Sequence, residues 1–141
     1  MHEYRTKVVW KNDRIGTLET GSGNVMEFSS PPEFKGVEGR IVPEELFVAS
    51  ENTCILLTFI AYAEKMRVEF LSYDCDAVGY LEQGETGLVI TRIVLRPKIV
   101  VKSEEDVRKT ERALELSLSR CFIANSIKSR VEVEPEIVVS E

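Results

Sequence analysis

A long apolar helix in the first half of the chain is the feature that most constrains the fold. Pro43 suits the first helical position, and the two acids after it favour the positive end of the helix dipole, so we predict a helix from Pro43 to about Met66. From Ile55 to Ala63 this segment is apolar on nearly every side. Such a helix must be buried all round, by a wrapping sheet or by a partner subunit. The apolar run is too short to cross a bilayer, which takes ~20 residues.

Segments with β-forming residues and turn signals predict strands before this helix, and alternation with a period of two predicts strands after it. The expected strands are 4–10, 15–20, 24–28, 68–82, 88–101 and 131–139. Turns are expected at Asn12-Asp13 and at Gly84–Gly87, and Ser103 with Asp106 resembles a capping box that opens a second helix ending near Cys121. The order βββ-α-ββ-α-β predicts an α+β fold, with curved antiparallel sheets around a long buried central helix, in a single domain spanning 1–141.

Charge and histidine content exclude several kinds of function. The net charge is −6 and basic residues are interspersed with acids, so no basic stripe is available for nucleic acid. The first residues are polar and charged rather than a secretory leader, and we expect a cytoplasmic protein that does not enter a membrane. His2 is the single histidine, which argues against a Ser–His–Asp or Cys–His site and against a zinc site. We expect neither a metal nor a cofactor.

Three cysteines, Cys54, Cys75 and Cys121, direct attention to thiol chemistry. In a chain without an export signal they are more often reduced than bridged. Packing as a small apolar side chain is the common fate of a free cysteine, and that interpretation stays open for each of them. Cys75 falls on the apolar face of an expected strand, where nothing nearby would ionise it, and we interpret it as core.

A reactive Cys54 needs a cation from elsewhere in the fold, because the dipole of its own helix fades after the first turn. Arg14, Arg40 and Lys65 are the candidates. Arginine suits the role because its planar fork can hold a thiolate and a carboxylate together. Glu44 serves at least to stabilise the first turn of the helix. It lies ~15 Å from Cys54 along a straight helix, so contact would require a bridging arginine or a bend.

Two motifs resemble the OsmC/Ohr family of osmotically inducible and organic-hydroperoxide-resistance proteins. The stretch from Pro43 to Ala49, followed by Cys54, is similar to the family helix written PEELhhAA…C. The stretch from Cys121 to Ile127 is similar to the second family motif, and Pro31 to Phe34 looks like the segment that precedes the helix. The resemblance extends over nearly the whole chain and includes the order of the elements.

The resemblance implies an intertwined homodimer that takes part in the stress response by reducing organic hydroperoxides. It makes Cys54 the peroxidatic cysteine, which becomes a sulfenic acid, and Cys121 the resolving cysteine, which forms a disulfide with it. Glu44 matches the glutamate of the family, and Arg14 sits in the loop where the family places its thiolate-binding arginine. A dithiol reductant, for which a lipoyl-type carrier is one candidate, would then restore the pair.

Other residues lead to further expectations and to two alternative functions. Apolar walls from Ile55 and Phe59 would favour alkyl hydroperoxides over hydrogen peroxide. Phe122 and Ala124 replace commoner residues, and Glu51 puts a charge where the family often has a ring, so it would reshape the pocket or repel a thiolate. A helix wrapped by a sheet is also the outline of hot-dog thioesterases, in which Glu51 would activate water. Alternatively, the chain is a non-catalytic or weakly active dimer that binds an apolar ligand, with its cysteines merely packed.

Overall fold

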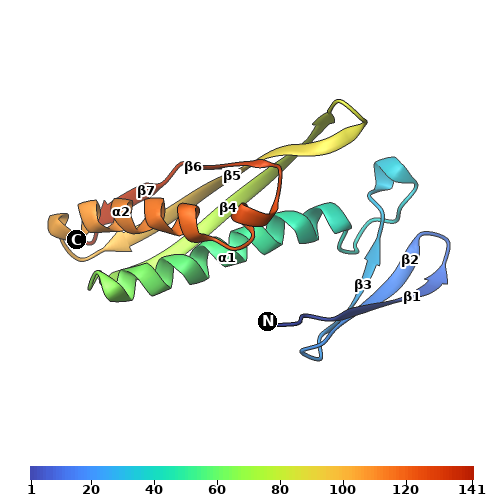
Figure 1. Cartoon of the computed structure of the whole chain (residues 1–141), viewed down its shortest axis with the longest axis horizontal. Coiled ribbons are helices and arrows are strands. Elements are labelled where there is room, and N and C mark those ends of the chain that lie inside the picture. Colours follow the sequence, from blue (N-terminus) through green and yellow to red (C-terminus); the bar gives the residue numbers. More distant parts are fainter. The chain divides into compact units, whose positions relative to one another are not determined.

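The N-terminal part of the protein is a small antiparallel sheet. The computed structural model describes all residues from 1 to 141, and the chain divides into two compact units, Met1–Phe47 and Val48–Glu141. In the first unit, β1 (Thr6–Asn12), β2 (Ile15–Thr20) and β3 (Val25–Ser29) pair in that order, and a short 3-10 helix, η1 (Pro32–Phe34), follows (Figure 1). Asp13 has φ 44° between β1 and β2, which confirms the expected turn. A single domain over 1–141 stays a prediction.

Helix α1 (Pro43–Lys65) is the predicted apolar helix, and its end lies within a residue of the expected one. One stripe of its side chains is buried: Glu51, Ile55, Phe59 and Ala63. Leu57, on another face, is 66% exposed, so a single chain covers only one side of this helix. By length and composition α1 could also cross a membrane, a criterion that core helices of soluble proteins pass as well.

A long hairpin forms the centre of the second unit. Strands β4 (Phe70–Gln83) and β5 (Leu88–Val101) pair antiparallel along their length. The expected turn is confirmed, because the Gly84 N–H donates to the Gly87 carbonyl at 2.7 Å. Helix α2 (Glu104–Arg120), the 3-10 helix η2 (Ala124–Ser126) and strands β6 (Arg130–Val133) and β7 (Glu136–Val139) complete the chain.

The final strand differs from the expectation in two ways. The predicted segment 131–139 is divided into β6 and β7, with Glu134 and Pro135 between them. Pro135 has no N–H with which to continue a ladder. Both strands also pair parallel to β5 rather than antiparallel, because α2 provides the crossover that a parallel connection needs. The larger sheet is therefore mixed, and the expectation of antiparallel sheets is correct only for the pairings among β1–β3 and between β4 and β5.

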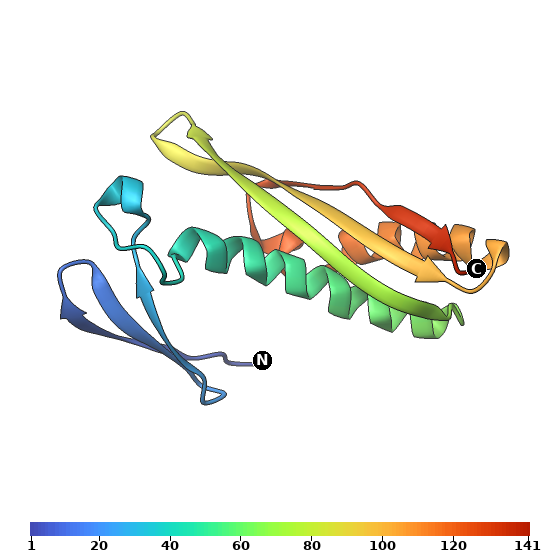
Figure 2. The same ribbon diagram turned by 180° about the vertical axis from the view of Figure 1, so that it is seen from behind.

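Both helices pack on one face of the sheet formed by β4 to β7 (Figures 1 and 2). The buried core between these layers contains Phe59, Ala63, Val68, Ile99, Val101, Ala113 and Leu114. The fully buried ring of Phe59 lies 5.2 Å from that of Phe70 and 5.6 Å from that of Tyr73, between centroids. This core holds α1 and α2 together against the same strands.

The start of α2 is built differently from the predicted capping box. Ser103 is the N-cap residue, but its hydroxyl lies 3.2 Å from the Asp106 carboxylate and makes no hydrogen bond to the helix backbone. The Asp106 N–H donates instead to the Ser103 carbonyl at 3.1 Å. The helix therefore begins at the expected residue, whereas the reciprocal side-chain bonds of a capping box are absent.

Gly79 allows α1 to approach β4 closely. A Cβ at this position would lie 2.5 Å from Cγ2 of Val48, far inside ordinary packing distance. A second tie between these elements is the Asn52 side-chain amide, which donates to the Cys75 carbonyl at 3.2 Å. Together these contacts determine where the middle of α1, which carries Cys54, lies on the sheet.

Candidate functional site

The structure brings Cys54 and Cys121 together where the end of α2 meets the middle of α1. Cys54 is half-buried on α1, and Cys121 is fully buried at the point where α2 ends. Cys121 has φ −65° and ψ 123°, so the chain leaves the helix there and the next residues lie over Cys54. Cys121 belongs to the buried core, and its thiol is a neighbour of Cys54 that lowers the pKa of the Cys54 thiol.

Hydrogen bonds favour the ionised form of Cys54. Burial by itself would raise the pKa of this thiol, but hydrogen bonds from Cys121 and from the backbone of Ile123 and Phe122 outweigh it and lower the pKa below its ordinary value. The Thr58 hydroxyl, one turn further along α1, donates to the Cys54 carbonyl at 2.9 Å and lies 3.9 Å from the Cys54 Sγ, where it also lowers the pKa of the thiol. Dipoles from the chain thus stabilise the thiolate without an imidazole.

Glu51 lies against Cys121 inside the protein. Its side chain is fully buried, and the Cys121 Sγ lies 3.4 Å from Oε2 and 3.6 Å from Oε1. Burial raises the pKa of the Glu51 carboxyl above its ordinary value. Burial, followed by the hydrogen bond to Cys54 and the charge of Glu51, raises the pKa of the Cys121 thiol to about 12. The surroundings therefore make the two thiols unlike: Cys54 is favoured as a thiolate and Cys121 as a neutral thiol.

Cys75 belongs to β4 and has different neighbours. It is half-buried, with its Sγ 3.6 Å from the Asp76 carbonyl oxygen. Burial, together with the negative charges of Asp76 and Asp74, raises the pKa of this thiol. This agrees with the prediction that nothing near Cys75 ionises it, although its side chain is less buried than a core position implies.

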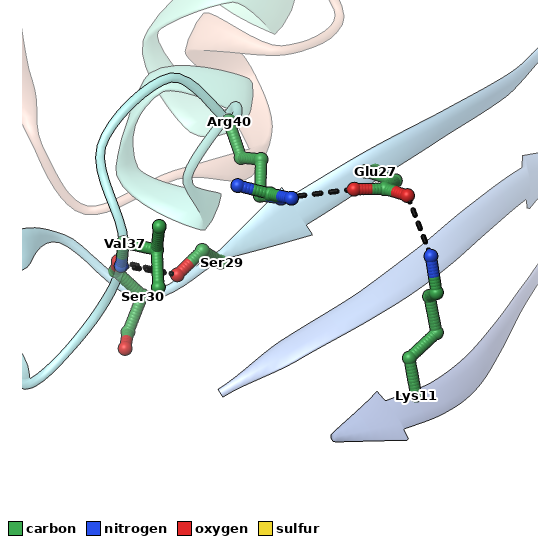
Figure 3. Close-up of polar contacts among 6 residues, drawn as sticks. All are labelled: Lys11, Glu27, Ser29, Ser30, Val37 and Arg40. Atoms are coloured by element: carbon green, nitrogen blue, oxygen red, sulfur yellow. Dashed lines mark hydrogen bonds and ion pairs between the residues drawn. The ribbon is translucent and has the colours of Figure 1, made fainter. Parts of the chain in front are cut away.

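Two of the three predicted cations are engaged elsewhere. The Arg40 guanidinium donates to one oxygen of Glu27 at 2.9 Å, and the Lys11 ammonium binds the other oxygen at 2.7 Å (Figure 3). The Lys65 ammonium lies 5.2 Å from the centroid of an aromatic ring on its own helix. Arg14 is exposed in the turn between β1 and β2, and no ion pair or hydrogen bond engages its guanidinium.

Arg14 and Glu44 belong to the N-terminal unit, whereas both cysteines belong to the C-terminal unit. In the first turn of α1 the Glu44 Oε1 is buried and has no hydrogen-bond partner. Burying a carboxylate oxygen without a hydrogen bond costs free energy, so a hydrogen-bond donor is expected beside this oxygen. The roles of Arg14 and Glu44 at the thiol stay predictions.

An apolar pocket of about 330 Å³ lies beside Arg14 within the N-terminal unit. Its apolar wall residues are Val8, Trp10, Ile15, Phe28 and Pro43. A pocket of this size and lining suits a small apolar molecule with one polar anchor. The expectation that Ile55 and Phe59 form pocket walls is wrong for this chain, because they are 1% and 0% exposed and belong to the core.

Sequence reasoning missed most of the groups that hold the thiols. A threonine four residues after a helical cysteine is a signal that could have pointed to Thr58. The backbone donors of Phe122 and Ile123 carry no residue signal, and the contact between Glu51 and Cys121 depends on how two helices cross. No group of three or more His, Cys, Asp and Glu side chains gathers in a way that could hold a metal ion.

Known proteins resemble this chain in both sequence and structure. The sequence model described as OsmC-like protein matches residues 36–136 of the chain. The solved structure of an OsmC-like protein of unknown function from Vibrio cholerae is 32% identical in sequence, with a TM-score of 0.88, over 96% of this chain and 99% of that one. Among curated proteins, the uncharacterized protein YmaD of Bacillus subtilis is 26% identical over 143 residues, covering 98% of this chain and 95% of that protein.

The same fold occurs in a solved structure named as an organic hydroperoxide resistance protein, from Legionella pneumophila. It is 18% identical, with a TM-score of 0.73, and the match covers 98% of both chains. At this identity the likeness concerns the fold alone.

Proposed function

Because this chain belongs to the OsmC-like protein family, we propose that it is a thiol-dependent peroxidase that reduces organic hydroperoxides. The observation that carries the proposal is the environment of Cys54, whose pKa is lowered, against the effect of burial, by Cys121 and the backbone that follows it. A second thiol beside the first is what a peroxidatic and resolving pair requires. The organic hydroperoxide resistance proteins that share the fold support the substrate class.

In the first step the Cys54 thiolate attacks the distal oxygen of the hydroperoxide. A sulfur–oxygen bond forms while the oxygen–oxygen bond breaks, and the bonding electrons leave with the alkoxide, which takes up a proton and becomes an alcohol. Cys54 is left as a sulfenic acid. The backbone donors over Cys54 favour this step because they keep the thiol ionised.

In the second step Cys121 attacks the Cys54 sulfur. A disulfide between Cys54 and Cys121 forms and water leaves. Exchange with a dithiol reductant, for which a lipoyl-type carrier is our candidate, returns both thiols to the reduced state. The half-buried position of Cys54 suits this exchange, because the reductant must reach one sulfur of the disulfide. We expect this cycle to run in the cytoplasm, where such reductants keep thiols reduced.

We assign Arg14 and Glu44 to hold the thiolate and the peroxide. An arginine fork can bind a carboxylate and a thiolate together. The free guanidinium of Arg14 and the unpartnered Oε1 of Glu44 support this assignment. The apolar pocket beside Arg14 would accept the alkyl group, which favours organic hydroperoxides over hydrogen peroxide.

We also propose that the working form is a homodimer. Leu57 on α1 is 66% exposed, and Val8 and Trp10 on β1 are 60% and 74% exposed. A partner subunit that covers these apolar side chains would remove them from water. Sedimentation equilibrium gives the mass directly, and a monomer at micromolar concentration would contradict this part of the proposal.

The peroxidase proposal is tested with purified protein, cumene hydroperoxide and dihydrolipoamide. We expect the wild type and Cys75→Ser to consume the peroxide at similar rates and Cys54→Ser to consume none above background. Mass spectrometry after one equivalent of peroxide should find a disulfide between Cys54 and Cys121, with Cys75 free. Peroxide consumption by Cys54→Ser equal to that of the wild type would refute the proposal.

The two alternative functions have their own outcomes in the same experiments. Slow alkylation of Cys54 together with no disulfide after peroxide would indicate a non-catalytic dimer that binds an apolar ligand. Hydrolysis of an acyl thioester that depends on Glu51 and not on Cys54 would indicate a thioesterase. The burial of Glu51 against Cys121 does not favour hydrolysis, because a water-activating carboxylate must face water and substrate.

A further inference from the structure

Glu51 is the only acidic side chain that is fully buried in this protein. The Cys121 thiol is the only hydrogen-bond partner of its two carboxylate oxygens. A carboxylate taken out of water is normally paired with a cation or held by several donors, and one weak S–H donor compensates little of that cost. Packing alone does not explain the residue, because an amide or an apolar side chain of similar volume would fill the same space more cheaply.

Cys121 must be deprotonated before it can form the disulfide. To attack Cys54 its sulfur must lose a proton, because the thiolate is the nucleophile. Its surroundings work against this, since burial and the neighbouring negative charges raise the pKa of the thiol to about 12. Cys121 is fully buried, so bulk water cannot act as the base. The group that takes the proton must already lie beside the sulfur, and Glu51 and Cys54 are the titratable groups that face it.

From this geometry we propose that Glu51 is the general base that removes the Cys121 proton as the disulfide forms. The inference rests on the proposed function and adds a catalytic residue to its second step. The Glu51 oxygens at 3.4 and 3.6 Å from the sulfur are within reach of the proton without any rearrangement of the backbone.

The S–H bond of Cys121 breaks and its proton moves to the Glu51 carboxylate. The sulfur–hydrogen electron pair forms the new sulfur–sulfur bond with Cys54, and the Cys54 sulfur–oxygen bond breaks. The departing hydroxide takes the proton from Glu51 and leaves as water, which restores the carboxylate. The two thiol sulfurs are oxidised overall by the peroxide already consumed, so no further oxidant is needed.

The position of Cys121 between two acceptors also orders the two steps. Its thiol has one proton, and both the Cys54 sulfur and the Glu51 carboxylate face it. Before peroxide arrives, Cys121 lowers the pKa of Cys54 and so favours the Cys54 thiolate, which competes for this proton. Once Cys54 is a sulfenic acid its charge is gone, and Glu51 is the remaining anionic acceptor. The same proton thus activates Cys54 first and is then removed to activate Cys121.

Glu51→Gln tests the inference because it keeps the shape of the side chain and removes the base. Glu64→Gln is the matched control, since Glu64 is exposed on the same helix. In rapid-quench experiments with one equivalent of cumene hydroperoxide, the Cys54 sulfenic acid is trapped with dimedone and the disulfide is measured by mass spectrometry. We expect Glu51→Gln to form the sulfenic acid at a rate close to the wild type and the disulfide about 100-fold more slowly, and Glu64→Gln to match the wild type in both.

The direction in which Glu51→Gln changes the rate of disulfide formation distinguishes a Glu51 that acts as a base from one that only repels the Cys121 thiolate. The charge of Glu51 raises the pKa of Cys121, so its removal by itself makes the Cys121 thiolate more accessible. If Glu51 only repelled the thiolate, Glu51→Gln would speed up disulfide formation. A slower step in Glu51→Gln is expected only if Glu51 takes the proton. Disulfide formation in Glu51→Gln at or above the wild-type rate would overturn the inference while leaving the peroxidase proposal intact.

A second assay tests Glu51 without peroxide. Reaction with 5,5′-dithiobis(2-nitrobenzoate) in a Cys75→Ser background places a nitrothiobenzoate group on Cys54, and Cys121 then displaces the coloured thiolate. Slow displacement in Glu51→Gln, beside normal displacement in Glu64→Gln, is expected even if organic hydroperoxides prove to be the wrong substrates. Equal displacement in both variants would refute the role of Glu51. Labelling of Cys54 at the wild-type rate, rather than at the faster rate of a fully exposed thiol, shows that the variant is folded at this site.

Discussion

The hydrogen bond from Cys121 to Cys54 can be tested by replacing the donor. Cys121→Ala removes it, whereas Cys121→Ser keeps a hydroxyl that can donate to the Cys54 thiolate, so the two variants form a matched pair. A hydrogen bond to a charged group contributes about 1.5–3 kcal/mol. At about 1.36 kcal/mol for each factor of ten, its loss lowers the thiolate population of Cys54 roughly 12- to 160-fold at a pH below the pKa.

The rate of reaction changes less than the thiolate population. A thiolate of higher basicity is also more nucleophilic, with a Brønsted coefficient of about 0.4–0.5, which recovers roughly the square root of the loss. We therefore expect Cys54 in Cys121→Ala to react with iodoacetamide about 4- to 13-fold more slowly at pH 6 than in Cys121→Ser.

Alkylation of Cys54 is followed by mass spectrometry of its peptide between pH 5 and pH 10, which keeps it separate from Cys75. A change in access alters the rate by the same factor at every pH, whereas loss of the hydrogen bond moves the midpoint of the profile to higher pH. Coincident midpoints in Cys121→Ala and Cys121→Ser would refute the view that the second thiol holds the charge of the first.

Three further predictions concern the stability of the fold, each measured by urea unfolding. Burial raises the pKa of Glu51 above 4.5 in the folded state, so its contribution to stability is complete below the unfolded-state pKa and is lost as the pH rises through the folded-state pKa. Glu51→Gln should therefore be more stable than the wild type at pH 7 and similar to it at pH 4; an equal difference at both would contradict this. Phe59→Ala should lose about 3–5 kcal/mol, because the ring is fully buried between two others, and a loss under 1 kcal/mol would show that the site collapses. Gly79→Ala should lower the free energy of unfolding by about 1–3 kcal/mol, because the new methyl group overlaps Val48. Adding Val48→Ala to the same chain should reduce that loss.

Much of the local structure follows from residue pattern. The turn residues around Ile15–Thr20, and the hairpin connection before Leu88–Val101, predict β2 and β5 with the boundaries that the structure has. Proline and two acids at the start of α1 predict its first residue, because these signals act within one turn of helix. The division of 131–139 at Pro135 was missed, since the alternating apolar residues on either side continue the same pattern. The direction of pairing with β5 is not local either, because it depends on the course of the connecting helix.

The sequence by itself determined the two helices, the first five strands to within two residues and, through its two motifs, the pair Cys54 and Cys121. These features depend on residue type and short spacing, which a linear chain displays directly. Only the tertiary structure decided how the pair is tuned. The crossing of α1 and α2 places the Cys121 thiol between Cys54 and the buried carboxylate of Glu51. Hydrogen bonds and burial lower the pKa of one thiol and raise that of the other, and both effects arise from neighbours that are distant in the chain.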